Sequence, residues 1–545
     1  MWFEDQIILP RIARSFLWMI VIQEIYLSLI FLILKIIAWN PFSGFIEWLF
    51  YLIHWKTLTY RGILCFTTVA FGALNRRFYC AEKHICSTRF EKLCRALSPR
   101  QIQHFIITTI LGGVASYCCI KLFQNFDPDK QSLLSPFLIL EDDFEHFFVV
   151  QHGCYTAIMF NLKYFICFLY LVKFSLNQET KIQYMKRQAF DLVKDSIICV
   201  LKGLHWFYLL HIFTGPVMEN RLTLLGFELS ANESYVSLLH SVINMKLLLV
   251  TFMTGVIIFL NWSLYLYILN VFIVERHVFP IEIPVKSDKS KSLSAALKNS
   301  ESDILKYLAV VDFRLMAQQD PERRKQIFAI SHPGGHPHQW KAVSDFCMSS
   351  LNEFVNKLHE YCIITAAKES KLNYNKGNFT AVDRQKYSVE PSQEMPLSEK
   401  VIAYLRKWPI VAYFLDELPS TKIRKLFTPS QPLIWMIEAL GYLVSASYTE
   451  DKFGVIQQTL PDIIRLLLDM KVAEEKLPID LVGIRTHVKD PYGRYEHIHQ
   501  RVALKNSVNA SLCRIADTFK NDINGIYLPE EYLRYLQRYL NRKNI

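Results

Sequence analysis

An almost unbroken apolar run, FLWMIVIQEIYLSLIFLILKIIAW, occupies residues 16–39. A helix rises about 1.5 Å per residue, so a helix over this run is long enough to cross a hydrocarbon core of roughly 30 Å. The residues before the run lack the short apolar core and the small-residue cleavage site of a removable signal. We therefore expect a retained membrane span near the start of the chain.

Further apolar runs follow in the first half, and the loops between them alternate in charge. Residues 76–100 are rich in Arg and Lys, which the positive-inside rule places in the cytosol. The loop after the next run is acidic, and a later loop carries Asn232 in Asn-Glu-Ser, a glycosylation acceptor that is usable only in the lumen. The alternation predicts six crossings and two cytosolic termini. The predicted spans are 16–39, 57–74, 102–123, 147–172, 196–215 and 245–274.

Composition divides the chain into a membrane part and a soluble part. With 51% hydrophobic residues and a mean hydropathy of +0.16, it is too apolar for an ordinary soluble protein. Residues 1–275 hold nearly all the long apolar runs, and 276–302 form a basic linker, either held to an anionic leaflet or a solvated tether. Residues 303–545 read as a soluble helical domain with a flexible insert at 369–398. The predicted fold is all-α: a polytopic membrane protein followed by a cytosolic helical domain.

The net charge of +11 does not indicate nucleic-acid binding. Much of the excess lies in loops beside the spans, and no compact basic patch is interleaved with aromatic residues. The positive-inside rule accounts for such a distribution. We therefore predict no direct contact with nucleic acid.

A few polar residues lie within the predicted spans. Glu24 is a carboxylate deep in the first span, and such a group indicates either a transport or proton-relay role or a hydrogen-bonded contact between helices. Transporters usually show internal repeats and paired broken helices, and neither is found. Contacts between helices are therefore the favoured role for Glu24, for Asn261 and for His205 and His211, while Arg61 is expected to extend toward the headgroups.

The twelve cysteines form no CxxC pair, and most lie in spans or cytosolic regions, so no disulfide framework is expected. One cytosolic loop contains residues of the types that bind zinc. Their spacing, C-x3-H-x-C-x7-C, matches no common zinc-finger arrangement, so we predict free thiols near the membrane and no metal. These residues are Cys80, His84, Cys86 and Cys94.

The segment SHPGGHPHQW at residues 331–340 is a candidate docking turn. Its prolines and paired glycines prevent a helix, and a helical stripe of apolar residues begins at Trp340. Metal binding by the histidines and a nucleophile pair of His336 with Cys347 or Cys362 are alternatives. Catalysis would need a carboxylate at a fixed spacing from the histidine, and none is found. The glycines also lack the GK[ST] ending of a phosphate-binding loop. We therefore expect no catalytic residue and no cofactor. The structural or docking residues are His332, Pro333, Gly334, Gly335, His336, Pro337, His338 and Trp340.

A second apolar segment, PLIWMIEALGYLVSAS at residues 432–447, requires a decision between membrane and core. It is shorter than a span and contains Glu438. We predict a buried core helix. This choice keeps the C-terminus on the cytosolic side.

The segment SHPGGHPHQW, together with the multi-span half, the lysine-rich linker and the terminal block LKNSVNASLCRIADTFKNDINGIYLPEEYLRYLQRYL, resembles the nuclear division cycle transmembrane nucleoporins. The resemblance implies a non-enzymatic scaffold of the nuclear envelope that anchors the nuclear pore complex, acts in pore assembly and insertion, and so serves transport of mRNA and protein. The implied partners are envelope lipids, the beta-propeller nucleoporin Aladin, the membrane-binding linker nucleoporins of the inner ring and other pore-membrane proteins. Homo-oligomerisation stays open, and a multi-span transporter or an endoplasmic reticulum enzyme is the alternative.

Overall fold

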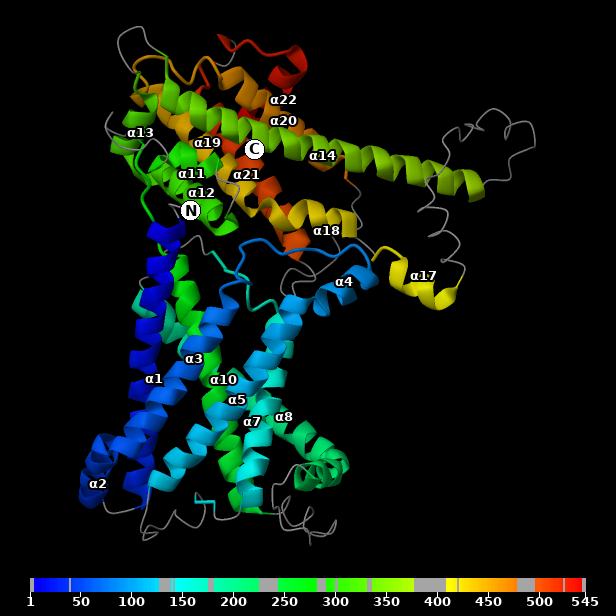
Figure 1. Ribbon diagram of the computed structural model, residues 1–545. Coiled ribbons are helices and arrows are strands. Elements are labelled where there is room, and N and C mark those ends of the chain that lie inside the picture. Colours follow the sequence, from blue (N-terminus) through cyan, green and yellow to red (C-terminus); the bar gives the residue numbers. More distant parts are fainter. Residues whose placement is uncertain are drawn as a thin grey trace. The chain divides into compact units, whose positions relative to one another are not determined.

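The computed structural model is built from helices (Figure 1). Within the described residues there is no β-strand, only isolated backbone bridges. The all-α prediction is therefore confirmed. The structure describes residues 4–38, 41–126, 139–140, 143–174, 181–224, 244–281, 291–298, 302–330, 336–376, 408–418, 421–477, 496–522 and 525–541.

The chain separates into two compact units. Unit 1 contains Met1–Cys80 and Leu97–Glu275, and unit 2 contains Ala81–Ala96 and Arg276–Ile545. Unit 2 thus includes a short segment that lies, in sequence, between two helices of unit 1. A stretch that hydropathy assigns to a loop beside the membrane is therefore part of the second unit.

Unit 1 is arranged around its last helix, which is apolar on nearly every side and contacts α1, α3, α5, α7 and α8. A helix of this kind is buried among others or in a membrane. At its middle, the Trp262 ring stacks on Phe71 with centroids 4.5 Å apart and meets Phe160 edge-on at 5.3 Å. The elements are η1 (Glu4–Ile8), α1 (Leu9–Ala38), α2 (Pro41–Ile53), α3 (Trp55–Asn75), α5 (Pro99–Phe126), α7 (Asp143–Ile166), α8 (Lys181–Leu224) and α10 (Met245–Ile273).

Small residues let α5 and α7 approach closely. A Cβ on Gly112 would lie 2.6 Å from the Gly153 carbonyl oxygen, and a Cβ on Gly153 would lie 1.7 Å from Ser116 Oγ. No real side chain fits at such distances. This is the packing that small residues make possible between membrane helices, where backbone proximity replaces the hydrophobic effect.

Four described helices are long and apolar enough to cross a membrane, which corrects the predicted count of six. The fourth predicted span lies on α7 and the fifth on α8. α7 carries Gln151, His152, Asn161 and Lys163 and is not among the four. On α8, the predicted span contains Lys202 and continues past Ile212, the last residue of this helix whose side chain the structure describes. The four stretches are Gln6–Ile37, Trp55–Asn75, Pro99–Phe126 and Met245–Ile273.

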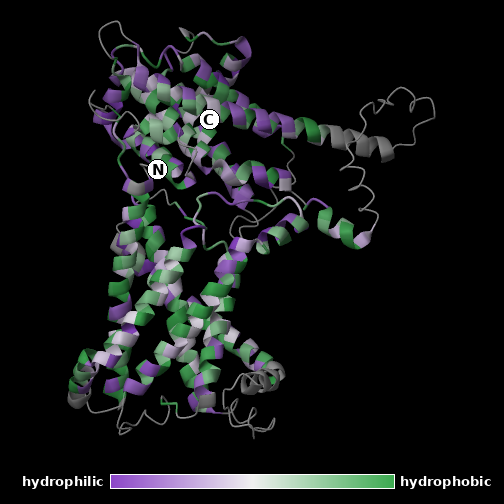
Figure 2. Cartoon of the chain, in the orientation of Figure 1, coloured by the Kyte–Doolittle hydropathy of each residue, from purple (hydrophilic) through white to green (hydrophobic). Residues whose placement is uncertain are grey.

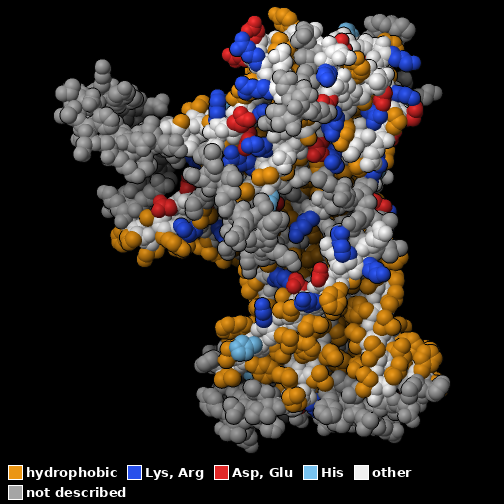
Figure 3. All heavy atoms as spheres, turned by 180° about the vertical axis from the view of Figure 1, so that it is seen from behind, with side chains coloured by type: hydrophobic (Ala, Val, Ile, Leu, Met, Phe, Trp, Pro, Cys, Tyr) orange, Lys and Arg blue, Asp and Glu red, His pale blue; other side chains and the backbone are white. Residues whose placement is uncertain are grey.

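The apolar residues of α1 are mostly not buried by protein. Only 22% of its most apolar stretch lies inside the structure, and Leu17, Ile25 and Ile33 are each more than half exposed. Figure 2 shows hydrophobic residues along α1, α3, α5 and α10, and Figure 3 shows hydrophobic side chains covering much of the surface of unit 1. An exposed apolar surface of this extent requires a lipid or protein cover.

Unit 2 is packed around α19, which runs from Gln431 to Glu450 and contacts α12, α13, α14 and α21. Trp435, Ile437 and Leu440 in this helix are completely buried, which confirms the predicted core helix. The other elements are α4 (Arg89–Ala96), α11 (Leu293–Lys298), α12 (Asp303–Gln319), α13 (Pro321–Phe328), α14 (His338–Lys376), α17 (Pro409–Leu415), α18 (Thr421–Phe427), η3 (Thr428–Ser430), α20 (Leu460–Glu475), α21 (Glu496–Thr518) and α22 (Glu530–Asn541).

Two segments expected to be loose are ordered where the structure describes them. In the basic linker, Phe279 and Ile281 are buried and α11 buries Leu293 in unit 2. The first part of the predicted flexible insert, 369–376, is helical, because α14 continues to Lys376. The remainder of that insert, 377–398, lies outside the described residues. The described parts of the linker are therefore not a free tether, because apolar side chains anchor them.

Candidate functional site

The predicted docking turn leads directly into α14 and is anchored by Trp340. The Trp340 side chain is 1% exposed, and its indole Nε1 donates a hydrogen bond to Thr459 Oγ1 at 3.1 Å. His336 and His338 are both exposed, with ring centroids 6.4 Å apart. Both imidazoles therefore lie at the surface beside the buried Trp340, and their docking role stays a prediction. His332, Pro333, Gly334 and Gly335 lie outside the described residues.

The cysteines of α14 are poor partners for a catalytic histidine. Cys347 is completely buried, and burial raises the pKa of its thiol to about 12. Burial also raises the pKa of Cys362, whose Sγ lies 3.9 Å from the Ala473 carbonyl oxygen. A thiol reacts as a nucleophile only in its thiolate form, so both groups stay protonated and inert at neutral pH. The geometry therefore opposes the nucleophile pair that the sequence left open.

Glu24 lies at a junction between α1 and α3. Its Oε2 is 2.5 Å from an Arg61 guanidinium nitrogen, which also donates to Ser28 Oγ at 2.6 Å. The Cys65 thiol donates to Glu24 Oε1 at 3.3 Å. Arg61 is 4% exposed, so the expectation that it extends toward the headgroups is wrong. Pairing with a carboxylate compensates for the cost of holding a cation among apolar helices.

Asn261 joins α10 to α1 on a different face from Glu24. Tyr26 donates a hydrogen bond from its hydroxyl to Asn261 Oδ1, and Asn261 is 1% exposed. His211 is buried edge-on against Phe148 at a centroid distance of 4.7 Å, whereas His205 is exposed. Asn261 and His211 are therefore placed as contacts between helices, whereas the exposed His205 is not. The roles of Glu24 and Asn261 in the working protein stay predictions, and Asn232 lies outside the described residues.

The cysteine-rich loop is not assembled as a four-residue zinc set. His84 and Cys86 come together with Glu91, whose ligand atoms lie within 4.8 Å of theirs, but Cys80 belongs to unit 1 and Cys94 is exposed. Glu91 already accepts the Ser87 N–H at 2.6 Å, which lowers the pKa of Glu91. This bond caps the start of α4 in the manner of a capping box. The cap accounts for the position of the Glu91 carboxylate.

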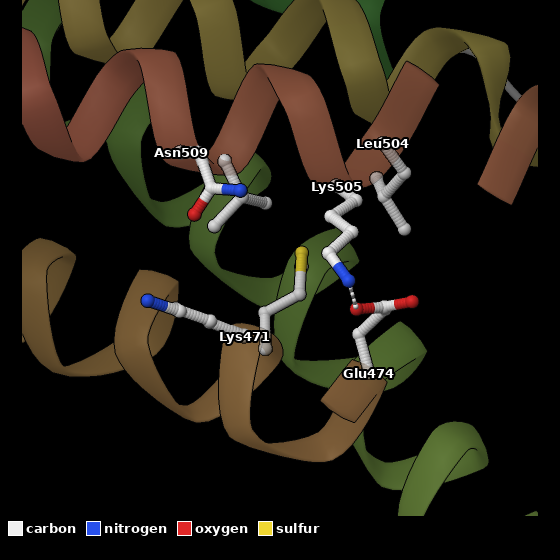
Figure 4. A pocket seen from close by; sticks show the side chains of 7 residues that line it. Lys471, Glu474, Leu504, Lys505 and Asn509 are labelled. Carbon is white, nitrogen blue, oxygen red and sulfur yellow. Dashed lines mark ion pairs between the residues drawn. The ribbon is translucent and has the colours of Figure 1, made fainter. Parts of the chain in front are cut away.

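The hollow between α20 and α21 is a small seam between the two helices. It has a volume of about 10 Å³, which is room for no more than a water molecule. Figure 4 shows Lys505 and Glu474 pointing toward one another, and their ion pair measures 3.4 Å. Arg501 Nε donates to the other Glu474 oxygen at 2.9 Å. The seam therefore joins helices and is too small for a cofactor.

The sequence reasoning missed a buried ion network in unit 2. Asp312 is completely buried and accepts two hydrogen bonds from Arg323, at 2.9 and 2.8 Å. It also accepts the Phe279 N–H at 3.0 Å and lies 3.5 Å from Arg276. The one signal in the sequence is a carboxylate on the apolar face of residues 303–319. Its partners lie on other elements, so the pairing itself had no sequence signature.

Comparisons with known proteins agree with the resemblance. A family model described as nucleoporin protein Ndc1-Nup matches residues 7–403 and 366–537. Nucleoporin NDC1 of Mus musculus is 23% identical over 98% of this chain and 96% of its own length, and nucleoporin Ndc1 of Drosophila melanogaster is 20% identical over 97% of both. Nucleoporin ndc-1 of Caenorhabditis elegans is 26% identical over 50% of this chain and 48% of its own length. These relatives are named as nucleoporins and not as enzymes. The chain therefore belongs to the Ndc1 family of nucleoporins, membrane proteins of the nuclear pore.

Proposed function

We propose that this nucleoporin anchors the nuclear pore complex in the nuclear envelope and acts in pore assembly and insertion. Unit 1 is embedded in the bilayer, and unit 2 presents docking surfaces to soluble nucleoporins. The observation that carries the proposal is α1, an apolar helix of which only 22% is buried by protein. Such a helix is stable in lipid and unstable in water.

The proposed membrane arrangement has several crossings and both termini on the cytosolic, pore-facing side. α7 crosses with its neighbours although its own hydropathy is low, because its polar groups are turned inward. Asn161 donates to Thr108 Oγ1 on α5, and His152 is 1% exposed. Polar groups that face other helices are tolerated at membrane depth. The basic residues 76–100 support the orientation.

The proposed partners are the envelope lipids, Aladin, the inner-ring membrane-binding linker nucleoporins and other pore-membrane proteins. The exposed His336 and His338 on the anchored turn form one docking surface. A shallow groove of about 310 Å³ between α14 and α18 is another, lined by Lys357, Lys422 and Lys425 among others. A basic groove of this kind suits an acidic segment of a partner.

The proposal is tested by location and by extraction. A tagged copy is expected at punctate sites on the nuclear rim and in the membrane pellet after alkaline carbonate treatment. Replacing Leu17, Ile25 and Ile33 on the exposed face of α1 by Arg costs about 2.5–3.5 kcal/mol for each residue placed near the bilayer centre, and is expected to oppose insertion of α1 and to lower the amount of protein at the nuclear rim. Ile363→Arg, at an exposed position of α14, is the matched control and should change neither the location at the nuclear rim nor the recovery in the membrane pellet. A reticular pattern, or extraction of the unaltered chain, would contradict the proposal.

A further inference from the structure

Two short helices of unit 2 carry large apolar side chains that are not buried. α17, with the sequence PIVAYFL, has no buried residue, and neither has α4. Figure 3 shows hydrophobic side chains gathered over α17 at the left of the view. Contiguous exposed apolar surface marks a site of interaction. We use the name α4–α17 surface for the side chains of Phe90, Leu93, Trp408, Ile410, Tyr413 and Phe414, which are between 37% and 73% exposed.

The two helices are joined to one another. The Arg89 guanidinium on α4 lies 4.1 Å from the centroid of the Tyr413 ring and donates to the Tyr413 carbonyl oxygen at 2.8 Å. Beside it, the Leu418 N–H donates to the Ser87 carbonyl oxygen at 3.0 Å. The position of α4 therefore determines the position of α17.

The chain itself places α4 close to a membrane helix. α4 ends at Ala96 and α5 begins at Pro99, so a few residues of chain separate the two helices. An extended residue spans at most about 3.5 Å, which limits this separation to roughly 10 Å. The apolar run of α5 begins at Ile102, only one turn into the helix. If α5 crosses the bilayer, α4 lies at its surface.

The charges of α4 suit an anionic membrane surface. The helix carries Arg89, Lys92 and Arg95 against the single carboxylate of Glu91, which is engaged with the Ser87 N–H. Lys92 is exposed. Basic residues interleaved with Trp, Tyr and aliphatic side chains are typical of helices that lie in the interface between headgroups and acyl chains.

We propose that the α4–α17 surface is a peripheral membrane contact, which inserts its apolar side chains among the headgroups of the bilayer that α5 crosses and sets Lys92 against anionic lipid. Lipid is the occupant favoured over a protein because the covalent link to α5 brings the surface to the bilayer without a further binding step. The inference rests on the proposed membrane role of unit 1. It adds a contact made by unit 2.

The test uses the full chain in vesicles that contain a phosphatidylcholine with a photoreactive diazirine near the headgroup. After illumination, labelled peptides are identified by mass spectrometry. Peptides of α17 and α4 are expected to be labelled, in addition to those of α1 and α10. Adding phosphatidylserine to the vesicles is expected to increase the labelling of α17, and salt to reduce that increase.

A variant and its control separate insertion from chance proximity. Ile410→Asp alters a side chain that is 73% exposed and should reduce the labelling of α17 about fivefold or more, because a carboxylate opposes both the apolar and the electrostatic contribution. Ile363→Asp alters a side chain that is 69% exposed on α14 and should leave the labelling of α17 unchanged. Since both residues are exposed, neither replacement disturbs a core.

The outcomes distinguish this inference from the proposed function. Labelling of α1 and α10 without α17 would overturn the inference while membrane anchoring stands, and the surface would then be assigned to a protein partner. Labelling of none of these helices would overturn both. If phosphatidylserine did not change the labelling of α17, the proposed contact of Lys92 with anionic lipid would be wrong. If Ile410→Asp did not reduce the labelling, the proposed insertion of the apolar side chains would be wrong.

Discussion

At the scale of single residues, Asp312 shows how buried charge organises unit 2. Its carboxylate is completely buried between Arg323 and the segment that directly follows α10, where the Phe279 N–H and Arg276 contact it. Burying a carboxylate is unfavourable unless its lone pairs are satisfied, and here hydrogen bonds satisfy both oxygens. The network ties the start of unit 2 to α12 and α13.

The same residue gives a stability prediction. Asp312→Ala leaves the largely buried Arg323 guanidinium without its carboxylate and is expected to lower the free energy of unfolding of unit 2 by about 3 kcal/mol. Glu322→Ala, which removes an exposed pair with Lys325, is the matched control and should change little. Pulse proteolysis of unit 2 in urea, with the full chain in vesicles, measures both. Equal effects of the two replacements would show that the network does not stabilise the unit.

At the scale of helices, close backbone approach explains two of the tightest pairs. α5 and α7 meet at Gly112 and Gly153, and α19 meets α21 at Gly441. A Cβ on Gly441 would lie 2.7 Å from Ser511 Oγ and 3.2 Å from Ser511 Cα. Since a backbone atom is involved, rotation of one side chain cannot relieve the contact. The spacing of α19 and α21 therefore depends on the absence of a side chain.

Gly441→Ala is expected to destabilise unit 2 by about 1–3 kcal/mol through overpacking, which exceeds the gain of about 0.5–1 kcal/mol in helix propensity. A Cβ on Gly525 would meet nothing within 4 Å, so Gly525→Ala is the matched control and should be neutral. Adding Ser511→Gly to Gly441→Ala should recover part of the loss, as a double-mutant cycle would measure. No recovery would mean that the loss has another origin.

At the scale of the whole molecule, the two units have separate cores. Trp262 is buried in unit 1 and Trp435 in unit 2, each 1% exposed or less. Each unit buries its own aromatic and aliphatic side chains, and chains with separate cores commonly unfold in more than one step. This division suits the proposed function, in which one unit lies in lipid and the other binds soluble partners.

Reciprocal replacements test this independence. Trp435→Ala removes a fully buried ring, at a cost of about 3–5 kcal/mol, and is expected to increase hydrogen exchange in α12, α19 and α21 while leaving α5 and α10 protected. Trp262→Ala is expected to increase hydrogen exchange in α5 and α10 while leaving α12, α19 and α21 protected. Hydrogen exchange of the full chain in vesicles measures both. If either replacement loosened all of these helices together, the chain would behave as one cooperative unit.

Local composition predicts much of this architecture. The candidate spans α1, α3, α5 and α10 are encoded in runs of apolar residues, because transfer into lipid depends on the residues of one helix alone. The stripe that begins at Trp340 and the core helix α19 are predictable on the same basis, since an amphipathic or short apolar helix carries its period in its own residues. The segment 331–340 indicates the family through the identity and order of its residues alone.

What sequence by itself determined is therefore where the apolar helices lie and to which family the chain belongs. Only the tertiary structure decided that Arg61 forms an ion pair with Glu24 and that Arg323 forms one with Asp312. It also decided that residues 81–96 belong to unit 2. These contacts depend on which helix faces which, and no residue carries that information in its neighbours along the chain. The polar residues of α7 show the same limit: they reduce its hydropathy, but packing against α5 and α10 determines whether they meet lipid or protein.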